Sequence, residues 1–474
     1  MDFVTKVVLA AILALAILDT VEIYSMSGIY WDFAVNVLNA RAFLTPFFYQ
    51  YMSTVHPPYP IVVTPHFYIE TFRDPLMPLL LTLLTIPLNG FAPVVYQIAI
   101  IFLLLASLIY FSSKTDVNLL LLALLFFNPY VLFNLFLLDG EEGLSLIIMI
   151  FTVALLFQKR WESGVLLGIA GLAKYPSLIF FPLLFLLPGR DLKLKGFAAF
   201  VVTSMPFLIV NFAYYGNPFA AYFNEMNFFS LGSSPGSSVI APSLLTIFAY
   251  LIPALLVLAA LFVSGNEMER DKAKRIDHRQ KVLFAAIALG TIGWLWLSRY
   301  PSLYSTPRMG YLMYLGVALE MAVLLGRFRF AQVNQWVPDL SWEAGGFSKS
   351  SLALGFMILI TVAVLGYSFV LAHQEQIFNT VGTGWIGFTT ARSLLGQFNF
   401  SNCSVISNAW VYLDYNNVTA YPPTDNSSQA VTMPRLVYYT AGESPSLVSI
   451  PLGSAVLHYS YDNLILPPNA SCSH

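Results

Sequence analysis

The arrangement of helices predicted from the sequence depends on the stretch SGVLLGIAGLAKYPSLIFFPLLFLL, residues 163–187. It is apolar, is broken in the middle by KYP, and is flanked by the basic runs QKRWE at 158–162 and GRDLKLK at 189–195. Because basic loops stay on the cytoplasmic side of a membrane, both ends should lie on that side. Each arm has roughly 11 residues and reaches about the bilayer midplane. The segment is therefore expected to be a re-entrant hairpin, covered by protein or a wet cavity.

The composition is typical of a membrane protein. Of the 474 residues, 57% are hydrophobic and 10% are charged, whereas about 25% of the residues of a soluble domain are charged. The net charge of -2 offers no strongly basic surface for nucleic acid. A spanning helix needs about 20 apolar residues. The sequence therefore predicts an α-helical polytopic membrane protein with spans at 4–24, 94–111, 118–138, 143–158, 196–214, 243–264, 281–298, 309–326 and 350–371.

The orientation of these spans divides the chain into two domains. The first apolar run, with Lys6 near its start, is expected to remain as a helix, because no small-residue cleavage site is clear. If the hairpin returns and 74–90 lies along the outer surface, the loop 25–93 falls outside the cell membrane. We expect a transmembrane module over 1–372 and a small extracytoplasmic α/β domain over 373–474, with a helix at 388–398 and strands at 404–406 and 455–459.

The predicted outer domain has sequence features of an extracytoplasmic compartment. Both cysteines of the chain, Cys403 and Cys472, lie in it, and outside the cell they can form a disulfide or remain as two thiols. Glycosylation sequons also cluster there and support the outer placement. They begin at Asn399, Asn402, Asn417, Asn426 and Asn469.

Charged side chains near a membrane are costly, so those in the predicted outer loops mark a candidate site. Lys174, at the hairpin tip, costs roughly 2.5–3.5 kcal/mol at the midplane and should have an anionic partner, a carboxylate or a lipid phosphate. The acids of the outer loops are Asp32, Asp74, Asp139, Glu141 and Glu142, and the other charged or imidazole groups are Arg41, Arg73, Arg299, Arg308, His56 and His66.

Each acid also has a purely structural interpretation. Asp32, Asp74 and Asp139 can each cap a helix, and Glu141 and Glu142 suit a helix N-terminus. Gathered on one face, however, these groups favour a reaction at an acidic lipid headgroup. A carboxylate can take a proton from an acceptor hydroxyl, and cations or a metal held by acids can stabilise a departing phosphate.

Several short motifs follow one another in order. They are WDFAVNVLNARAFL at 31–44, FRDPLMPLLLTLLTIPLNG at 72–90, LLDGEEG at 137–143, GLAKYPSLIFFPLLFLL at 171–187 and TPRMGYLMYL at 306–315. In this order they resemble the GT-C superfamily of polytopic glycosyltransferases, which use sugars linked to polyisoprenyl phosphate. The branch most similar is the protein O-mannosyltransferase and aminoarabinose-transferase type. The resemblance covers about residues 1–330.

The resemblance implies a GT-C-like module that moves a sugar from a donor of the dolichyl-phosphate type, with inversion, to a protein, lipid or glycan acceptor on the outer face. The isoprenoid would lie in a groove between spans. Asp32 would be the catalytic base. The second acid, supporting a divalent metal (Mg or Mn) or a cation network, would be Asp139, Glu141 or Glu142. The donor phosphate would be held by Lys174, Arg308 and Arg73. Asp74, His56 and Arg299 are further possible site residues, without an assigned role.

The sequence departs from the family pattern in two places, and each departure bears on the function. Asp32 stands alone where many relatives have an acidic pair, which a non-catalytic subunit of a glycosylation complex would explain. The string AWVYLDYNN at 409–417 does not match the Trp-Trp-Asp-Tyr-Gly motif of oligosaccharyltransferase catalytic subunits, which argues against that function. A lipid-linked sugar flippase or transporter would also carry a broken hairpin, but its two related halves are not visible in the sequence.

Overall fold

The fold is taken from a computed structural model, which describes the helices and strands and the links close to them. The described residues are 3–26, 31–44, 61–64, 67–70, 74–88, 91–115, 117–127, 131–137, 140–223, 278–297, 310–326, 404–407, 415–416, 419–421, 435–438, 450–452, 455–460 and 463–465. They belong to two compact units. The first comprises 1–21, 74–77 and 94–373, and the second comprises 22–73, 78–93 and 374–474.

The two units do not follow the order of the sequence. The whole C-terminal segment from residue 374 onward belongs to the second unit. The first long loop groups with the C-terminal segment and not with the helices of the first unit. Hydropathy marks the ends of spans but does not report which loops pack together, so the sequence could not predict this grouping.

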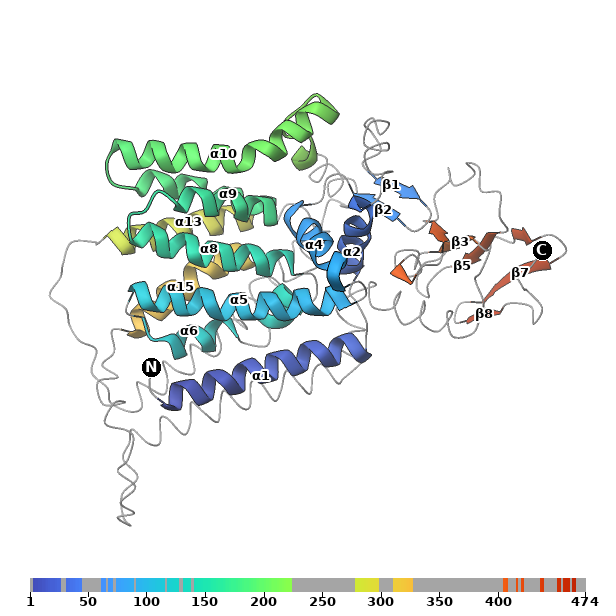
Figure 1. The fold of residues 1–474 in the computed structure, drawn as a ribbon, viewed down its shortest axis with the longest axis horizontal. Coiled ribbons are helices and arrows are strands. Elements are labelled where there is room, and N and C mark those ends of the chain that lie inside the picture. The colour runs from blue at the N-terminus through green and yellow to red at the C-terminus, as the bar shows by residue number, and fades with distance from the viewer. Residues whose placement is uncertain are drawn as a thin grey trace, which may run out of the picture. The chain divides into compact units, whose positions relative to one another are not determined.

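The first unit is a bundle of helices that run side by side (Figure 1). Its members are α1 (Phe3–Met26, whose last residues belong to the second unit), α5 (Ala92–Thr115), α6 (Leu119–Phe126), the π-helix η2 (Leu132–Leu137), α8 (Glu141–Phe157), α9 (Ser163–Ala173), the 3₁₀ helix η3 (Tyr175–Leu186), α10 (Arg190–Tyr215), α13 (His278–Leu297) and α15 (Tyr311–Gly326). By length and composition, three described helices can cross a membrane: Ala92–Thr115, Arg190–Ala213 and His278–Leu297.

Most predicted spans coincide with helices. The helices predicted at 94–111, 196–214 and 281–298 are confirmed as α5, α10 and α13, and those at 4–24, 143–158 and 309–326 are confirmed as α1, α8 and α15. The span expected at 118–138 is described as two separate helices, α6 and η2, and not as one. The spans expected at 243–264 and 350–371 lie outside the described residues.

Small and aromatic residues set the distances between helices of the bundle. A Cβ atom on Gly290 of α13 would overlap the carbonyl of Leu312 on α15, so this pair of helices approaches closely. Larger side chains separate α5 from α8, where the rings of Tyr110 and Phe151 lie 5.4 Å apart between centroids. The bundle core is apolar, as the fully buried Leu104 of α5 illustrates.

The segment 163–187 forms two short helical arms, which we call the hairpin. The arm α9 ends at Lys174, whose backbone is extended, with φ -158° and ψ 113°, and η3 returns alongside α9. A Cβ atom on Gly164, at the start of α9, would overlap the carbonyl of Gly196 on α10. Since η3 ends at Leu186 just before α10 begins, both ends of the hairpin lie at the same end of the bundle.

The second unit combines the first loop with short strands of the C-terminal segment. Its helices are α2 (Trp31–Phe43) and α4 (Leu76–Leu88, whose first residues belong to the first unit). Strands β1 (Ile61–Thr64) and β2 (Phe67–Glu70) form an antiparallel pair, and β2 packs against α2.

The C-terminal strands form two small sheets. Strand β3 (Ser404–Ser407) pairs in parallel with β4 (Thr419–Tyr421) on one side and β5 (Arg435–Tyr438) on the other. Strands β6 (Ile450–Leu452), β7 (Ala455–Ser460) and β8 (Asn463–Ile465) form an antiparallel sheet. The strands predicted at 404–406 and 455–459 are confirmed, and the helix predicted at 388–398 lies outside the described residues.

Candidate active site

The tip of the hairpin places Lys174 inside the bundle. Its backbone N–H donates to the carbonyl of Ala170, which ends α9, and its own carbonyl accepts from the N–H of Ser177, which begins η3. Lys174 is buried, being 6% exposed. The break in the hairpin therefore aims an ammonium group at the interior, where it needs an anionic partner.

Three carboxylates from two other segments supply that partner. The Lys174 Nζ lies 2.6 Å from Glu141 Oε2, 3.1 Å from Asp74 Oδ2 and 3.6 Å from Glu142 Oε1. All three acids are 0% exposed. We call Lys174, Asp74, Glu141 and Glu142 the charge cluster. The sequence predicted that separate outer segments would bring acids to the buried lysine, and the structure brings these together.

Asp74 fixes the hairpin tip at two points. Besides the contact with the Lys174 ammonium, its Oδ1 accepts a hydrogen bond of 2.7 Å from the backbone N–H of Tyr175. Asp74 directly precedes Pro75 and the start of α4, as a capping residue would. Its side chain nevertheless reaches the hairpin, a hundred residues further along the chain, and so joins two distant segments.

Glu141 and Glu142 enter the cluster because a glycine turns the chain into α8. Gly140 has φ +90°, a left-handed conformation that favours glycine, and it directly precedes the helix. The two glutamates occupy the first turn of α8, where the helix dipole favours negative charge. Glu141 bonds Lys174, whereas neither carboxylate oxygen of Glu142 has a hydrogen-bond partner among the described residues.

The acids outnumber the cation within the cluster. An ionised carboxylate that is buried without a partner is strongly disfavoured, so the cluster favours a proton on one acid or a further cation beside it. Among the described residues, no three His, Cys, Asp or Glu side chains are arranged to hold a metal ion. The Lys174 ammonium lies among the acids where such an ion would bind, so these residues do not fit a divalent metal.

A row of buried hydroxyl groups lies close to the hairpin tip. The hydroxyl of Ser177 is 2.6 Å from that of Ser145 and 2.8 Å from that of Tyr311. Ser145 also donates to the carbonyl of Ala170 in α9. These hydrogen bonds join the hairpin to α8 and α15 on either side of its tip.

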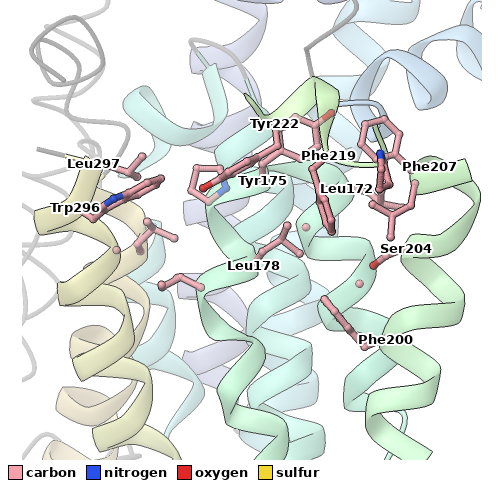
Figure 2. A pocket seen from close by; sticks show the side chains of 18 residues that line it. Leu172, Tyr175, Leu178, Phe200, Ser204, Phe207, Phe219, Tyr222, Trp296 and Leu297 are labelled. Carbon is pink, nitrogen blue, oxygen red and sulfur yellow. The ribbon is translucent and has the colours of Figure 1, made fainter. Parts of the chain in front are cut away.

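An apolar pocket of about 400 Å³ opens beside the hairpin tip. Figure 2 shows its lining residues, among them Tyr175 and Leu178 on η3, Phe200, Ser204 and Phe207 on α10, and Trp296 and Leu297 on α13. The ring of Tyr175 lies 5.6 Å from that of Phe207 and 6.4 Å from that of Tyr222. Tyr175 therefore contacts the charge cluster through its backbone and the pocket through its ring.

The charge cluster and the pocket account for only some of the predicted site residues, since most of the others lie outside the described part of the chain. Asp32 is the second residue of α2, in its first turn and not before it, and the description of the structure does not extend to its side chain. Asp32 belongs to the second unit, whereas the charge cluster belongs to the first. The residues outside the described part are Arg73, Asp139, His56, His66, Arg299, Arg308, Cys403, Cys472, Asn399, Asn402, Asn417, Asn426 and Asn469.

Sequence reasoning missed the hydroxyl row and the pocket. Ser177 directly follows the KYP break in the motif at 171–187, and Tyr311 lies in the motif at 306–315. No sequence pattern pairs residues 134 positions apart, however, and the hydrogen bond between them could not be foreseen. The pocket likewise arises where α10 and α13 meet the hairpin.

No protein-family model and no curated protein matches the sequence. Among solved structures, the chain is similar to the cryo-EM structure of arabinofuranosyltransferase AftD from Mycobacteria, with a TM-score of 0.43 and 15% identity over 84% of this chain and 29% of that chain. A mutant of the same enzyme matches with a TM-score of 0.43, 13% identity and coverages of 84% and 30%. This chain thus spans less than a third of the length of the proteins it matches.

Proposed function

We propose that the chain is an integral-membrane glycosyltransferase that moves a sugar from a polyisoprenyl-phosphate donor to an acceptor at the outer face of the cell membrane. One observation carries the proposal: the charge cluster and the apolar pocket adjoin at Tyr175. A donor with a charged head and a long hydrocarbon tail needs a polar and an apolar environment side by side. The long apolar helices of the first unit suit such a lipid substrate.

The pocket fits a segment of the donor's hydrocarbon tail. Its volume of about 400 Å³ is that of a small-molecule site, and its lining is almost entirely apolar or aromatic. One wall of the pocket is α10, and only 11% of the most apolar stretch of this helix is buried. The rest of a long isoprenoid would leave the pocket along α10 and lie among the membrane lipids.

The donor phosphate requires cations whose charge is not already offset. Lys174 faces three carboxylates within 3.6 Å, so it serves chiefly as the counter-ion that allows these acids to be buried. We therefore assign the phosphate to Arg73 and Arg308, with Arg299 as a further candidate, and give Lys174 a supporting role. Guanidinium groups bind phosphate oxygens in pairs, which suits this task.

The proposed reaction is a single displacement at the anomeric carbon. The acceptor oxygen attacks that carbon, Asp32 takes the acceptor proton, and the bond from the carbon to the phosphate oxygen breaks. The polyisoprenyl phosphate leaves with the electron pair, and the configuration of the sugar inverts. The predicted Mg or Mn ion stays a prediction, and no step is assigned to it because the described residues of the cluster do not fit one.

A donor panel tests the proposal. The purified protein in lipid bilayers would be incubated with polyprenyl-phosphate sugars and candidate protein, lipid and glycan acceptors, and release of the sugar would be followed. We expect turnover with at least one donor, its loss in Asp32→Asn, and its retention in Asp191→Asn, which changes an exposed acid at the start of α10. A folded wild-type protein that turns over no donor would overturn the proposal.

The broken hairpin also supports a second function, movement of the lipid-linked sugar across the membrane. Interrupted helices with a charged break are typical of transporter binding sites. A flippase would carry the intact donor between leaflets of sealed vesicles and would leave its sugar attached. Measuring the side of the vesicle on which the donor lies, together with sugar release, separates the two functions.

A further inference from the structure

The helix that carries Asp32 depends on its neighbours for its stability. In α2 every residue from 33 to 40 is buried, none being more than 5% exposed. An isolated helix of 13 residues is marginal in water, so packing must hold this one in place. Two of these neighbours are strand β2 of the first long loop and helix α4, which lies at the end of that loop. Strand β2 packs against α2, and the Thr82 hydroxyl of α4 donates to the Ala40 carbonyl over 3.2 Å.

A third neighbour comes from the C-terminal segment. The Nη1 of Arg41 donates a hydrogen bond of 2.9 Å to the backbone carbonyl of Tyr415, 374 residues away. The same guanidinium lies over the Tyr415 ring, with its central carbon 5.1 Å from the ring centroid. Arg41 stands in the last turn of α2, where the helix dipole favours a cation. One side chain thus makes three favourable interactions at the C-terminal end of the helix.

We propose that the Arg41–Tyr415 contact positions the helix that carries Asp32. The C-terminal segment would then contribute to catalysis by holding this helix in place. The role of Asp32 in this inference rests on the proposed function. About 13 Å of helix axis separates Asp32 from Arg41. Arg41 is therefore a positioning residue, which acts through the helix and not on the reacting atoms.

The chemistry of the contact requires arginine. A planar guanidinium can donate to a carbonyl and stack on an aromatic ring at the same time, whereas a lysine ammonium cannot present a plane to the ring. Arg41→Lys keeps the cation at the helix end and loses the stacking. Tyr415→Phe keeps both the backbone carbonyl and an aromatic ring, so it is the matched control for Tyr415→Ala.

Two readouts on the full-length protein in lipid bilayers test the inference. The first is hydrogen exchange over residues 33–43, which reports local opening of α2 whether or not the protein has activity. We expect exchange to rise about tenfold in Arg41→Met and Tyr415→Ala, less in Arg41→Lys, and hardly at all in Tyr415→Phe. The second is turnover, where kcat should fall in the same order while the KM for the donor stays constant.

The outcomes separate this inference from the proposed function. Unchanged exchange in both Arg41→Met and Tyr415→Ala would overturn it, as would faster exchange with an unchanged kcat. If the wild-type protein turned over no donor, the glycosyltransferase proposal and the role of Asp32 would fall. Exchange would then still decide whether the C-terminal segment holds α2.

Discussion

The single ammonium group of Lys174 lies among three buried carboxylates, so the acids of the charge cluster outnumber its cation. This excess of buried negative charge determines how substitutions at the site change the stability of the protein. Removing the ammonium leaves Asp74, Glu141 and Glu142 without their shared cation. Breaking a buried ion pair by removing one partner typically costs about 3–5 kcal/mol. Lys174→Met should therefore lower the midpoint of thermal unfolding sharply, measured in detergent or lipid, with Lys195→Met on the exposed side of α10 as the control. Equal midpoints for the two variants would contradict the burial of the cluster.

The two adjacent glutamates are predicted to respond in opposite ways. Glu141 receives a hydrogen bond of 2.6 Å from Lys174, while the oxygens of Glu142 have no hydrogen-bond partner among the described residues. Glu141→Gln should destabilise the protein by about 1–3 kcal/mol, because it weakens a buried charged hydrogen bond. Glu142→Gln removes an excess buried charge and should leave the protein equally stable or more stable. Chemical denaturation of both variants checks this, and a greater loss in Glu142→Gln would refute it.

At the scale of elements, the hairpin was predictable because its signals are local. The apolar stretch is too short to cross the membrane twice, it is broken at KYP, and basic runs flank it on both sides. These three signals favour a re-entrant segment over a spanning one. The 3₁₀ form of η3 was not predictable, since Pro176 and Pro182 restrict the backbone but do not choose between helix types. Nor could hydropathy show that the span expected at 118–138 is two helices, because α6 and η2 are both apolar.

Packing of the hairpin makes a prediction for two glycines of α9. A Cβ atom at Gly164 would overlap the backbone carbonyl of Gly196, whereas one at Gly171 would meet the flexible side chain of Leu178. The same added methyl group should therefore cost more in Gly164→Ala, about 1–3 kcal/mol, than in Gly171→Ala. Thermal unfolding of the two variants compares them, and the reverse order would contradict the close approach of α9 and α10.

The pocket between α10, α13 and η3 makes a prediction about substrate binding. Ser204 lines it, and its hydroxyl has no hydrogen-bond partner among the described residues, so Ser204→Phe fills space without breaking a described hydrogen bond. The KM for the donor should rise about tenfold or more, because the tail loses its site, and kcat should change little. Steady-state kinetics with Ser204→Ala as control measures this. A loss of kcat with constant KM would place the tail elsewhere.

At the scale of the whole molecule, the chain is a helical bundle and a second unit assembled from distant parts of the sequence. Composition and basic runs were enough to predict the bundle, because each span carries its own apolar signal. The grouping of the first loop with the C-terminal segment depends on contacts such as that between Arg41 and Tyr415, which no periodic pattern encodes. For the same reason the sequence named Asp74, Glu141, Glu142 and Lys174 as candidates without showing that they share one site.

The proposed function requires that a lipid-linked sugar donor binds where the charge cluster meets the apolar pocket. Photocrosslinking with a polyisoprenyl phosphate that carries a photoreactive group in its first isoprene units tests this directly, read by mass spectrometry of the labelled peptides. We expect labelling of η3 and α10 around Tyr175 and Phe207. Unmodified polyprenyl-phosphate sugar should compete with this labelling, and Ser204→Phe should abolish it. Labelling that spreads over the lipid-facing helices, or that the unmodified donor does not reduce, would contradict it.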